Sequence, residues 1–247
     1  MVVVLKLGGS VITEKDRPET LDGEALAALA DAIAAALDDG AVEDLAVVHG
    51  GGSFGHHHAA DRGVTTEEGI RDADGVMAVH GAMKTLNRFV LSRLHARDVP
   101  ALPVHPLSAA VRDGDGDLSL MTEQVATMLS EGFVPVLHGD GVVHAGEGVT
   151  VVSGDELVTE LATALDADRV GLCSTVPGVL DGDEVIPRIE AFEEVADVLG
   201  VSDATDVTGG MAAKVRELLA LGSPAYVFGP DAVEAFLAGE DAGTRIG

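Results

Sequence analysis

The sequence predicts an α/β protein with a mostly parallel sheet that helices cover on both faces. Short apolar segments alternate with longer segments of helical periodicity along the whole chain. Glycine-rich turns follow several of the apolar segments. The 247 residues, 47% of them hydrophobic, can bury a substantial core. We expect one domain, because no repeat, low-complexity segment or break in composition marks a linker. A soft division would separate an N-terminal lobe (1–150) from a C-terminal lobe (151–247).

Each expected strand is a short run rich in Val, Leu and Ile. The first, residues 2–7, continues directly into a glycine turn. The others are expected at residues 44–49, 101–104, 134–137, 149–153, 169–173, 225–228 and 244–246. Glycines punctuate residues 138–155, which favours a hairpin there. Cys173, in the strand at 169–173, is expected to be an ordinary core residue.

The expected helices have one apolar face each. The clearest begins near Asp22 and stops at Gly40, and its apolar face consists of Leu26, Leu29, Ile33 and Leu37. Further helices are expected over residues 75–97, 122–131, 155–165, 192–199, 210–221 and 231–238. Strands and helices that alternate in this way predict parallel strands joined by helical crossovers.

The charge balance excludes two classes of partner. Forty-two acidic residues face fifteen Lys and Arg, for a net charge of -27, which repels nucleic acids and anionic membranes. The acids are spread along the chain, which favours adaptation to concentrated salt over an ordinary acidic protein. The single cysteine excludes a disulfide within the chain. Without a charged leader or an apolar run of about 18 residues, we expect a soluble cytoplasmic protein.

The chain has only four lysines, and their placement is informative. Lys6, Lys15 and Lys214 lie beside glycine pairs, whereas Lys84 does not. Because nearly all other cations are Arg, this placement suggests selected point charges, although a chance arrangement is the alternative.

Three glycine-rich turns lie at strand ends or helix starts: "KLGGS" (6–10), "HGGGSFGH" (49–56) and "TGGMAAK" (208–214). Glycine lets the backbone approach a ligand closely and aim N–H groups at it. A helix N-terminus adds a partial positive charge. Together with the nearby Lys and His residues, the turns predict an anionic ligand that carries several phosphates.

Other interpretations of the second turn fit less well. Gly50, Gly52 and Gly55 satisfy G-x-G-x-x-G, but Asp72 and Asp74, the acids at the right distance for a ribose, precede a long helix instead of ending a strand. The Walker pattern is absent. Neighbouring side chains on a helix point about 100° apart, so the three histidines at 56–58 cannot converge on a metal.

The segments "LKLGGSVITEK", "VVHGGGSFGH", "VVSGD", "DVTGGMAAKV" and "GTRI" resemble the amino acid kinase superfamily, and within it the isopentenyl phosphate kinases. They extend from Lys6 to Ile246 in the expected order. The "GSFGH" element is the most specific, because relatives that act on amino acids or nucleotides generally lack its histidine. The resemblance implies an open three-layer α/β/α sandwich, usually a homodimer. It also implies transfer of a phosphoryl group from ATP, with Mg²⁺, to isopentenyl phosphate.

The resemblance further implies roles for individual residues. The ATP contacts would be Lys6, Gly8, Gly9, Ser10, Gly52, Asp155, Gly209, Gly210 and Lys214. The acceptor phosphate would be held by Gly51, His56 and Gly154. Lys6, Lys15, His56 and Lys214 would be catalytic, and Asp155 would orient the lysines or the magnesium ion. One departure is "STVPG" at 174–178, where Thr175 replaces the first acid of the family's "TDVDG".

The chemistry suits these residue types. A phosphate monoester has a second pKa near 6, so the acceptor is already ionised and needs no general base. The obstacle is repulsion between two anions, roughly 4 kcal/mol per pair of unit charges at about 4 Å and an effective dielectric of 20. Catalysis is therefore expected to rest on positioning and electrostatic stabilisation, with His56 as a hydrogen-bond donor.

Plainer interpretations stay open for each residue. His56 could be a capping or exposed histidine, Lys15 a solvated loop charge, and Lys214 a charge on a helix surface. Asp155 could be the N-cap of the helix that follows it. The side chains expected near the acceptor's five-carbon tail are equally well core residues: Val76, Met77, Val79 and Met83.

Two other functions compete with this one. Another kinase of the superfamily would act on an amino acid, a carbamate or a nucleoside monophosphate. A non-catalytic nucleotide-binding or regulatory subunit could share the fold, although the three lysines beside glycines argue against it.

Overall fold

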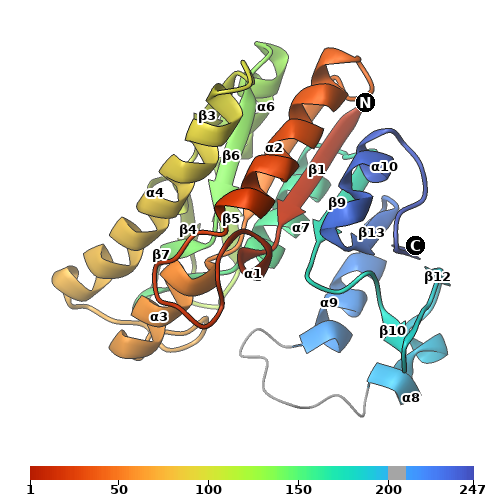
Figure 1. Cartoon of the computed structure of the whole chain (residues 1–247). Helices are drawn as coiled ribbons and strands as arrows, with labels where there is room; N and C mark the ends of the chain where they lie inside the picture. The colour runs from red at the N-terminus through yellow and green to blue at the C-terminus, as the bar shows by residue number, and fades with distance from the viewer. Residues whose placement is uncertain (200–209) are drawn as a thin grey trace.

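The central sheet of the computed structural model, which describes residues 1–199 and 210–247, has eight strands in the order β12-β14-β13-β9-β1-β2-β6-β3 (Figure 1). Neighbouring strands run parallel except β13 and β14. The strands are β1 (Val2–Leu7), β2 (Asp44–His49), β3 (Ala101–Pro103), β6 (Val134–His138), β9 (Arg169–Cys173), β12 (Arg188–Ile189), β13 (Ala225–Phe228) and β14 (Thr244–Ile246). The predicted mostly parallel sheet is confirmed.

Helices cover both faces of this sheet, which gives the three layers expected. One face carries α2 (Gly23–Asp38), α4 (Ala73–His95) and α10 (Val233–Leu237), and the other carries α6 (Thr122–Ser130), α7 (Gly154–Ala164) and α9 (Gly210–Leu219) (Figure 1). Each helical layer has its own hydrophobic core against the sheet. Because both faces are covered, the central strand β1 is apolar on both sides, and Val3, Val4 and Leu5 are at most 1% exposed.

A second sheet of four strands, in the order β5-β4-β7-β8, lies beside the main one. Its strands are β4 (Ala110–Arg112), β5 (Leu118–Leu120), β7 (Asp140–His144) and β8 (Gly148–Val152). The glycine-rich hairpin predicted over 138–155 is β7 and β8, which pair antiparallel. The strand expected at 149–153 therefore belongs to this smaller sheet and not to the parallel one.

The remaining elements are short, apart from one helix. They are α1 (Gly9–Ile12), α3 (Gly52–Arg62), α5 (Pro106–Ala109), β10 (Leu180–Asp181), β11 (Glu184–Val185), η1 (Phe192–Glu194), α8 (Ala196–Leu199) and η2 (Pro230–Ala232). The helix expected over 192–199 is divided at Val195 into η1 and α8, and the one expected over 231–238 forms as η2 followed by α10. Cys173 is buried, as predicted, and burial raises the pKa of its thiol to about 12.

The order of the strands determines where a ligand can bind. β1 lies between β2 and β9, so the chain proceeds outward from β1 in both directions across the sheet. In open α/β sheets, ligands bind outside the carboxyl ends of the strands at such a switch point. Lys6 is near the carboxyl end of β1, opposite Val48 and Leu172. Within the described ranges, no helix is both long enough and apolar enough to cross a membrane.

Candidate active site

The first two glycine turns pack backbone against backbone at the carboxyl ends of β1 and β2. A Cβ atom on Gly9 would lie 2.2 Å from the nitrogen of Gly52, and one on Gly50 would lie 2.7 Å from the nitrogen of Gly9. Gly52 also has a positive φ of 49°, which L side chains rarely adopt. The turns therefore need glycine in order to meet, and their contact brings the starts of α1 and α3 together.

Thr13 joins the two turns through its hydroxyl group. Its Oγ1 donates to the carbonyl of Gly9 at 2.8 Å and accepts from the N–H of Ser53 at 3.0 Å. Gly8 is anchored separately, because its N–H donates to the carbonyl of Cys173 at 2.9 Å. The backbone of residues 8–10 is thus held from β9 on one side and from α3 on the other, while Ser10 is exposed.

Replacing Gly9 with Ala should separate the two turns. The new Cβ would overlap backbone atoms that cannot rotate away, so we expect a loss of ~2 kcal/mol of stability and a melting temperature lower by about 4–8 °C. Gly23→Ala is the matched control, because no atom lies within 4 Å of its Cβ position at the start of α2. Thermal unfolding of both variants checks this, and equal melting temperatures would contradict the close packing of Gly9 against Gly52.

Lys6, Asp155 and Lys214 converge from three different elements. Lys6 Nζ of β1 lies 2.7 Å from Asp155 Oδ1, and Lys214 Nζ of α9 lies 3.7 Å from Asp155 Oδ2. All three side chains are largely buried, with 12%, 17% and 22% exposure for Lys6, Asp155 and Lys214. One carboxylate therefore holds two ammonium groups side by side near the carboxyl end of β1.

The electrostatic balance keeps Asp155 ionised. Burial alone would raise the pKa of Asp155, but the charges of Lys6 and Lys214 outweigh it and the pKa is lowered. Burial lowers the pKa of Lys6, although the attraction of Asp155 opposes the shift. A second anion that approaches Lys6 would favour its charged form further. The cluster is thus suited to receive phosphate oxygens.

The start of α7 fixes Asp155 in place. Ser153 is the N-cap: its side chain accepts from the N–H of Glu156, and the Glu156 carboxylate accepts from the N–H of Ser153. Arg112 of β4 donates to the same carboxylate at 2.7 Å. The alternative in which Asp155 is the N-cap is wrong, because Ser153 has that role and Asp155 points to the lysines instead. A Cβ on Gly154 would lie 3.2 Å from Lys6 Cε, so Gly154 is beside the same cluster.

The second glycine turn contains the start of α3 and lies next to Lys6 and Gly154. Gly51 is the N-cap of α3, and a Cβ on Gly51 or Gly55 would lie 3.5 Å or 2.6 Å from Met83 Sδ of α4. His56, in the first turns of α3, is exposed. A helical arrangement of the histidines was assumed from the sequence, but the bounds of this helix were not predicted, because glycine and histidine are weak helix formers. Its N-terminus forms where the glycine turns meet.

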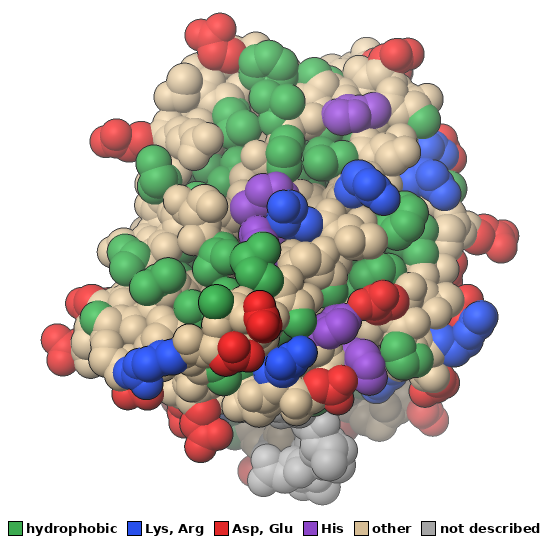
Figure 2. Space-filling model, turned by 90° about the vertical axis from the view of Figure 1, so that its left-hand side faces the viewer, with side chains coloured by type: hydrophobic (Ala, Val, Ile, Leu, Met, Phe, Trp, Pro, Cys, Tyr) green, Lys and Arg blue, Asp and Glu red, His purple; other side chains and the backbone are tan. Residues whose placement is uncertain are grey.

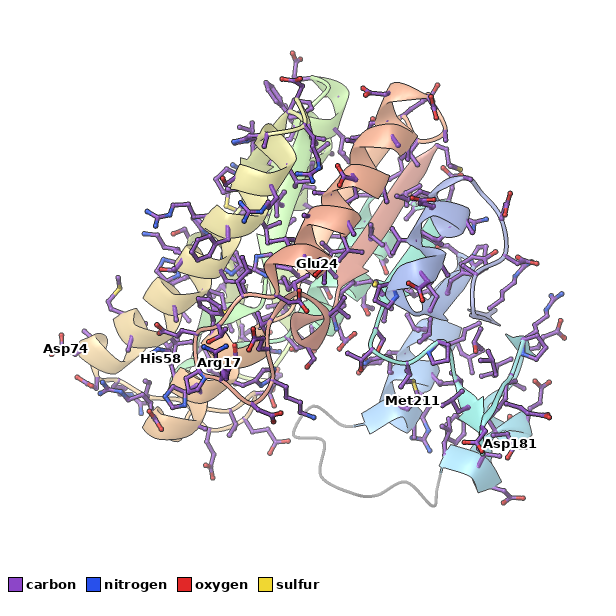
Figure 3. All side chains as sticks on the ribbon, viewed as in Figure 1. Arg17, Glu24, His58, Asp74, Asp181 and Met211 are labelled. Atoms are coloured by element: carbon purple, nitrogen blue, oxygen red, sulfur yellow. The ribbon has the colours of Figure 1, made fainter. Side chains whose placement is uncertain are left out.

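The two histidines that follow His56 have separate acidic partners. His57 Nε2 lies 3.6 Å from Asp61, and His58 Nε2 lies 2.5 Å from Glu19. Figure 3 shows His58 close to Arg17, both toward the end of the molecule at which β1 finishes, with Met211 of α9 across from them at that end. No group of three His, Cys, Asp or Glu residues in the described ranges could hold a metal ion.

Lys15 is not brought into the cluster. It is exposed on the loop of residues 14–20, which α3 holds through the hydrogen bonds of Ser53 with Glu19 and Thr20. The loop lies beside the glycine turns, so Lys15 is near the site but is not held in it.

Of the two glycines predicted to bind ATP from the third turn, only one lies within the described residues. Gly209 lies outside the described residues, and Gly210 is the first residue of α9. Thr175, the departure from the acidic segment, is exposed just after β9, where the N–H of Ser174 donates to the carbonyl of Phe228.

A small apolar cavity lies between α4 and the β7–β8 hairpin. Two of the four side chains expected near a hydrocarbon tail line it, Val76 and Val79, together with Val64, Ile70, Gly141, Val149, Thr150 and Val151. Met83 instead packs against the acceptor turn, and Met77 is 54% exposed. Val76 and Val79 therefore line this cavity whereas Met77 and Met83 do not, and contact of any of the four with a hydrocarbon tail stays a prediction.

Several residues that shape the site were not predicted from the sequence. Ser153 and Glu156 have the S-x-x-E spacing of a capping box, a signal that was available. Thr13 and Arg112 act through contacts between distant segments, for which the sequence carries no local signal.

The chain matches the model of the amino acid kinase family over residues 1–223. It is 65% identical to the isopentenyl phosphate kinase of Haloferax volcanii, over 99% of this chain and 98% of that protein. It is 33% identical to the isopentenyl phosphate kinase of Methanocaldococcus jannaschii, over 100% of this chain and 98% of that one. A solved structure described as an isopentenyl phosphate kinase superposes with a TM-score of 0.83 at 29% identity and covers all of both chains. The chain therefore belongs to the amino acid kinase family, and within it to the isopentenyl phosphate kinases.

Proposed function

We propose that the protein transfers the γ-phosphoryl group of ATP to isopentenyl phosphate, which gives isopentenyl diphosphate and ADP. The observation that carries this proposal is the Lys6–Asp155–Lys214 cluster beside the paired glycine turns. An oxygen of the acceptor phosphate attacks the γ-phosphorus, and the bond to the β,γ-bridging oxygen breaks. Two ammonium groups and glycine N–H groups stabilise the negative charge that the reactants bring together.

The nucleotide is held on the side of the C-terminal lobe (151–247). Lys6 and Lys214 contact its phosphates, Asp155 keeps both lysines oriented, and Gly8, Gly9, Ser10, Gly52, Gly209 and Gly210 supply backbone contacts. The chain has one Tyr and no Trp, so few aromatic side chains are available to stack on adenine.

The acceptor is held on the side of the N-terminal lobe (1–150). Gly51, His56 and Gly154 bind its phosphate, and Lys15 reaches the transferring phosphoryl group from the loop of residues 14–20. The hydrocarbon tail extends toward the apolar cavity that Val76 and Val79 line. A tail of five carbons suits an apolar wall, because no polar group of the tail would need a partner there.

Mg²⁺ enters this scheme with ATP. Magnesium is commonly bound by one or two carboxylates together with substrate phosphates, and Asp155 is a buried, ionised carboxylate beside the lysines. When bound, the ion neutralises charge on the ATP oxygens. Asp155 has at most one oxygen to offer it, because Oδ1 faces Lys6 at 2.7 Å.

The surface supports two further proposals, a homodimer and function in concentrated salt. Exposed hydrophobic side chains, among them Met77, Val111 and Val143, favour a homodimer. Figure 2 shows hydrophobic side chains in several patches on the face that carries α4, with acidic side chains spread around them. The net charge of -27 favours function in concentrated salt, where counter-ions screen the repulsion.

A substrate panel tests the function directly. Release of ADP should be measured with MgATP, high KCl and each of isopentenyl phosphate, an amino acid, a carbamate and a nucleoside monophosphate. We expect turnover with isopentenyl phosphate and its diphosphate as the product. Turnover with one of the other acceptors alone, or none with any, would overturn the proposal.

A further inference from the structure

A buried network of histidines lies directly behind the acceptor turn, and none of its members is among the residues proposed to bind ATP or the acceptor. His49 and His138 are fully buried at the ends of β2 and β6, and their rings stack with centroids 5.4 Å apart. His105 Nδ1 lies 2.8 Å from His138 Nε2, and His80 of α4 is paired with Asp140.

The two strand ends repeat one arrangement. His49 and His138 are register partners on neighbouring parallel strands, and a glycine follows each of them. Nδ1 of His49 lies 3.1 Å from the carbonyl oxygen of Gly50, and Nδ1 of His138 lies 2.9 Å from that of Gly139. The repetition in register indicates that each ring holds the peptide group that follows its own strand.

The protonation of His49 follows from its partners. Burial lowers its pKa to about 4, so the ring is neutral at pH 7 and has one N–H donor and one acceptor nitrogen. A carbonyl oxygen can only accept, so Nδ1 carries the proton and donates to Gly50. Nε2 must then accept a hydrogen bond from Asn87, whose side chain lies 3.2 Å away.

Asn87 can provide that donor. With its Oδ1 toward the ring, the buried Nδ2 has no hydrogen-bond partner in the described part of the chain. The two ends of an amide side chain are interchangeable by a half-turn. The turned amide donates from Nδ2 to Nε2 of His49, which gives that nitrogen a partner and selects the Nδ1–H form of the ring.

The hydrogen bond to Gly50 has a consequence for Gly51. No peptide bond in the described chain is cis, and in a trans peptide the carbonyl and the next N–H point in opposite directions. A Gly50 carbonyl fixed toward a buried ring therefore directs the Gly51 N–H away from the interior. No hydrogen bond within the described ranges occupies the N–H of Gly51.

We propose that His49, oriented by Asn87, is a positioning residue that aims the N–H of Gly51 at the phosphate of the acceptor. The inference rests on the proposed function, in which Gly51 binds that phosphate. His49 itself touches neither substrate, so its loss should weaken acceptor binding and leave ATP binding intact.

Two substitutions at the same position separate positioning from packing. In His49→Asn the amide nitrogen takes about the place of Nδ1 and can still donate to Gly50, whereas in His49→Gln it takes about the place of Nε2 and cannot. We expect H49Q to raise the KM for isopentenyl phosphate about tenfold, the effect of losing one hydrogen bond, with the KM for ATP unchanged. H49N should stay within about threefold of wild type.

The control variants are at a histidine near the amino end of a strand, away from the carboxyl ends where the ligands are proposed to bind. His95 lies at the end of α4 and contacts the carbonyl oxygen of Ala101 at 2.7 Å. H95N and H95Q should leave both KM values unchanged, and melting temperatures of all four variants separate unfolding from altered binding. Equal effects of H49N and H49Q on the KM for isopentenyl phosphate would overturn the proposal.

A second measurement needs neither folded variants nor substrate. The ¹⁵N chemical shifts of the wild-type His49 ring should report the neutral Nδ1–H form between pH 6 and 8, and an Nε2–H form would overturn the proposal. Failure of the wild-type enzyme to phosphorylate isopentenyl phosphate would count against the proposed function, while the ring shifts would still decide how His49 is protonated.

Discussion

Lys6→Met should reduce kcat about a thousandfold, which corresponds to ~4 kcal/mol of transition-state stabilisation. Methionine keeps most of the length and the apolar stem but removes the ammonium group that lies 2.7 Å from Asp155. Asp155 would then be paired with Lys214 alone, so the cluster would lose one of its two ammonium groups. The repulsion between the two substrates would remain uncompensated at the place where they meet.

Steady-state kinetics with MgATP and isopentenyl phosphate measures this effect. Lys84→Met is the matched control, because Lys84 is exposed on α4 and is not part of the Lys6–Asp155–Lys214 cluster; its kcat should equal that of wild type. Circular dichroism should show that Lys6→Met is folded, since Lys214 still pairs with the buried Asp155. A folded Lys6→Met enzyme with a kcat within tenfold of wild type would remove Lys6 from the reaction.

His56→Ala should lose most turnover, roughly a hundredfold in kcat, with no change in fold. His56 is exposed in the first turns of α3, so its side chain contributes little to the core. The acceptor is already ionised and needs no base, so the expected loss is that of a hydrogen-bond donor to phosphate. His56→Gln, which keeps a donor, should recover part of the activity.

His57→Ala is the control for that experiment. His57 is the next residue of the same helix, and its ring points toward Asp61. Its kcat should be unchanged, because neighbouring side chains on a helix point about 100° apart. Wild-type turnover in His56→Ala, or an equal loss in His57→Ala, would contradict the role given to His56.

Much of the fold was predictable because its signals are local. The strands of the main sheet at residues 2–7, 44–49, 169–173 and 225–228 have the predicted bounds, since continuous apolar runs of this length bury on both faces. The bounds of α3 were not predicted, because several of its residues have low intrinsic helix propensity. Contact between Gly9 and Gly52, a tertiary effect, determines where it starts.

For the site, too, local sequence signals predicted some residues, and only tertiary contacts identify the others. Glycines beside lysines are visible in the sequence, and they led to Lys6 and Lys214, which the structure brings together on Asp155. From the sequence, His49 was predicted only to be part of a glycine turn, because nothing local distinguishes it from any histidine at a strand end. Its partner Asn87 is 38 residues away, so only the packing of α4 on β2 brings them together.

A crystal structure of the complex with isopentenyl phosphate and a non-hydrolysable ATP analogue tests the central claim most directly. The account predicts that the acceptor phosphate and the γ-phosphate face each other between the two glycine turns, with Nζ of Lys6 and Lys214 in hydrogen-bonding distance of the ATP phosphates. Phosphates bound elsewhere, with both lysines still paired only to Asp155, would contradict it.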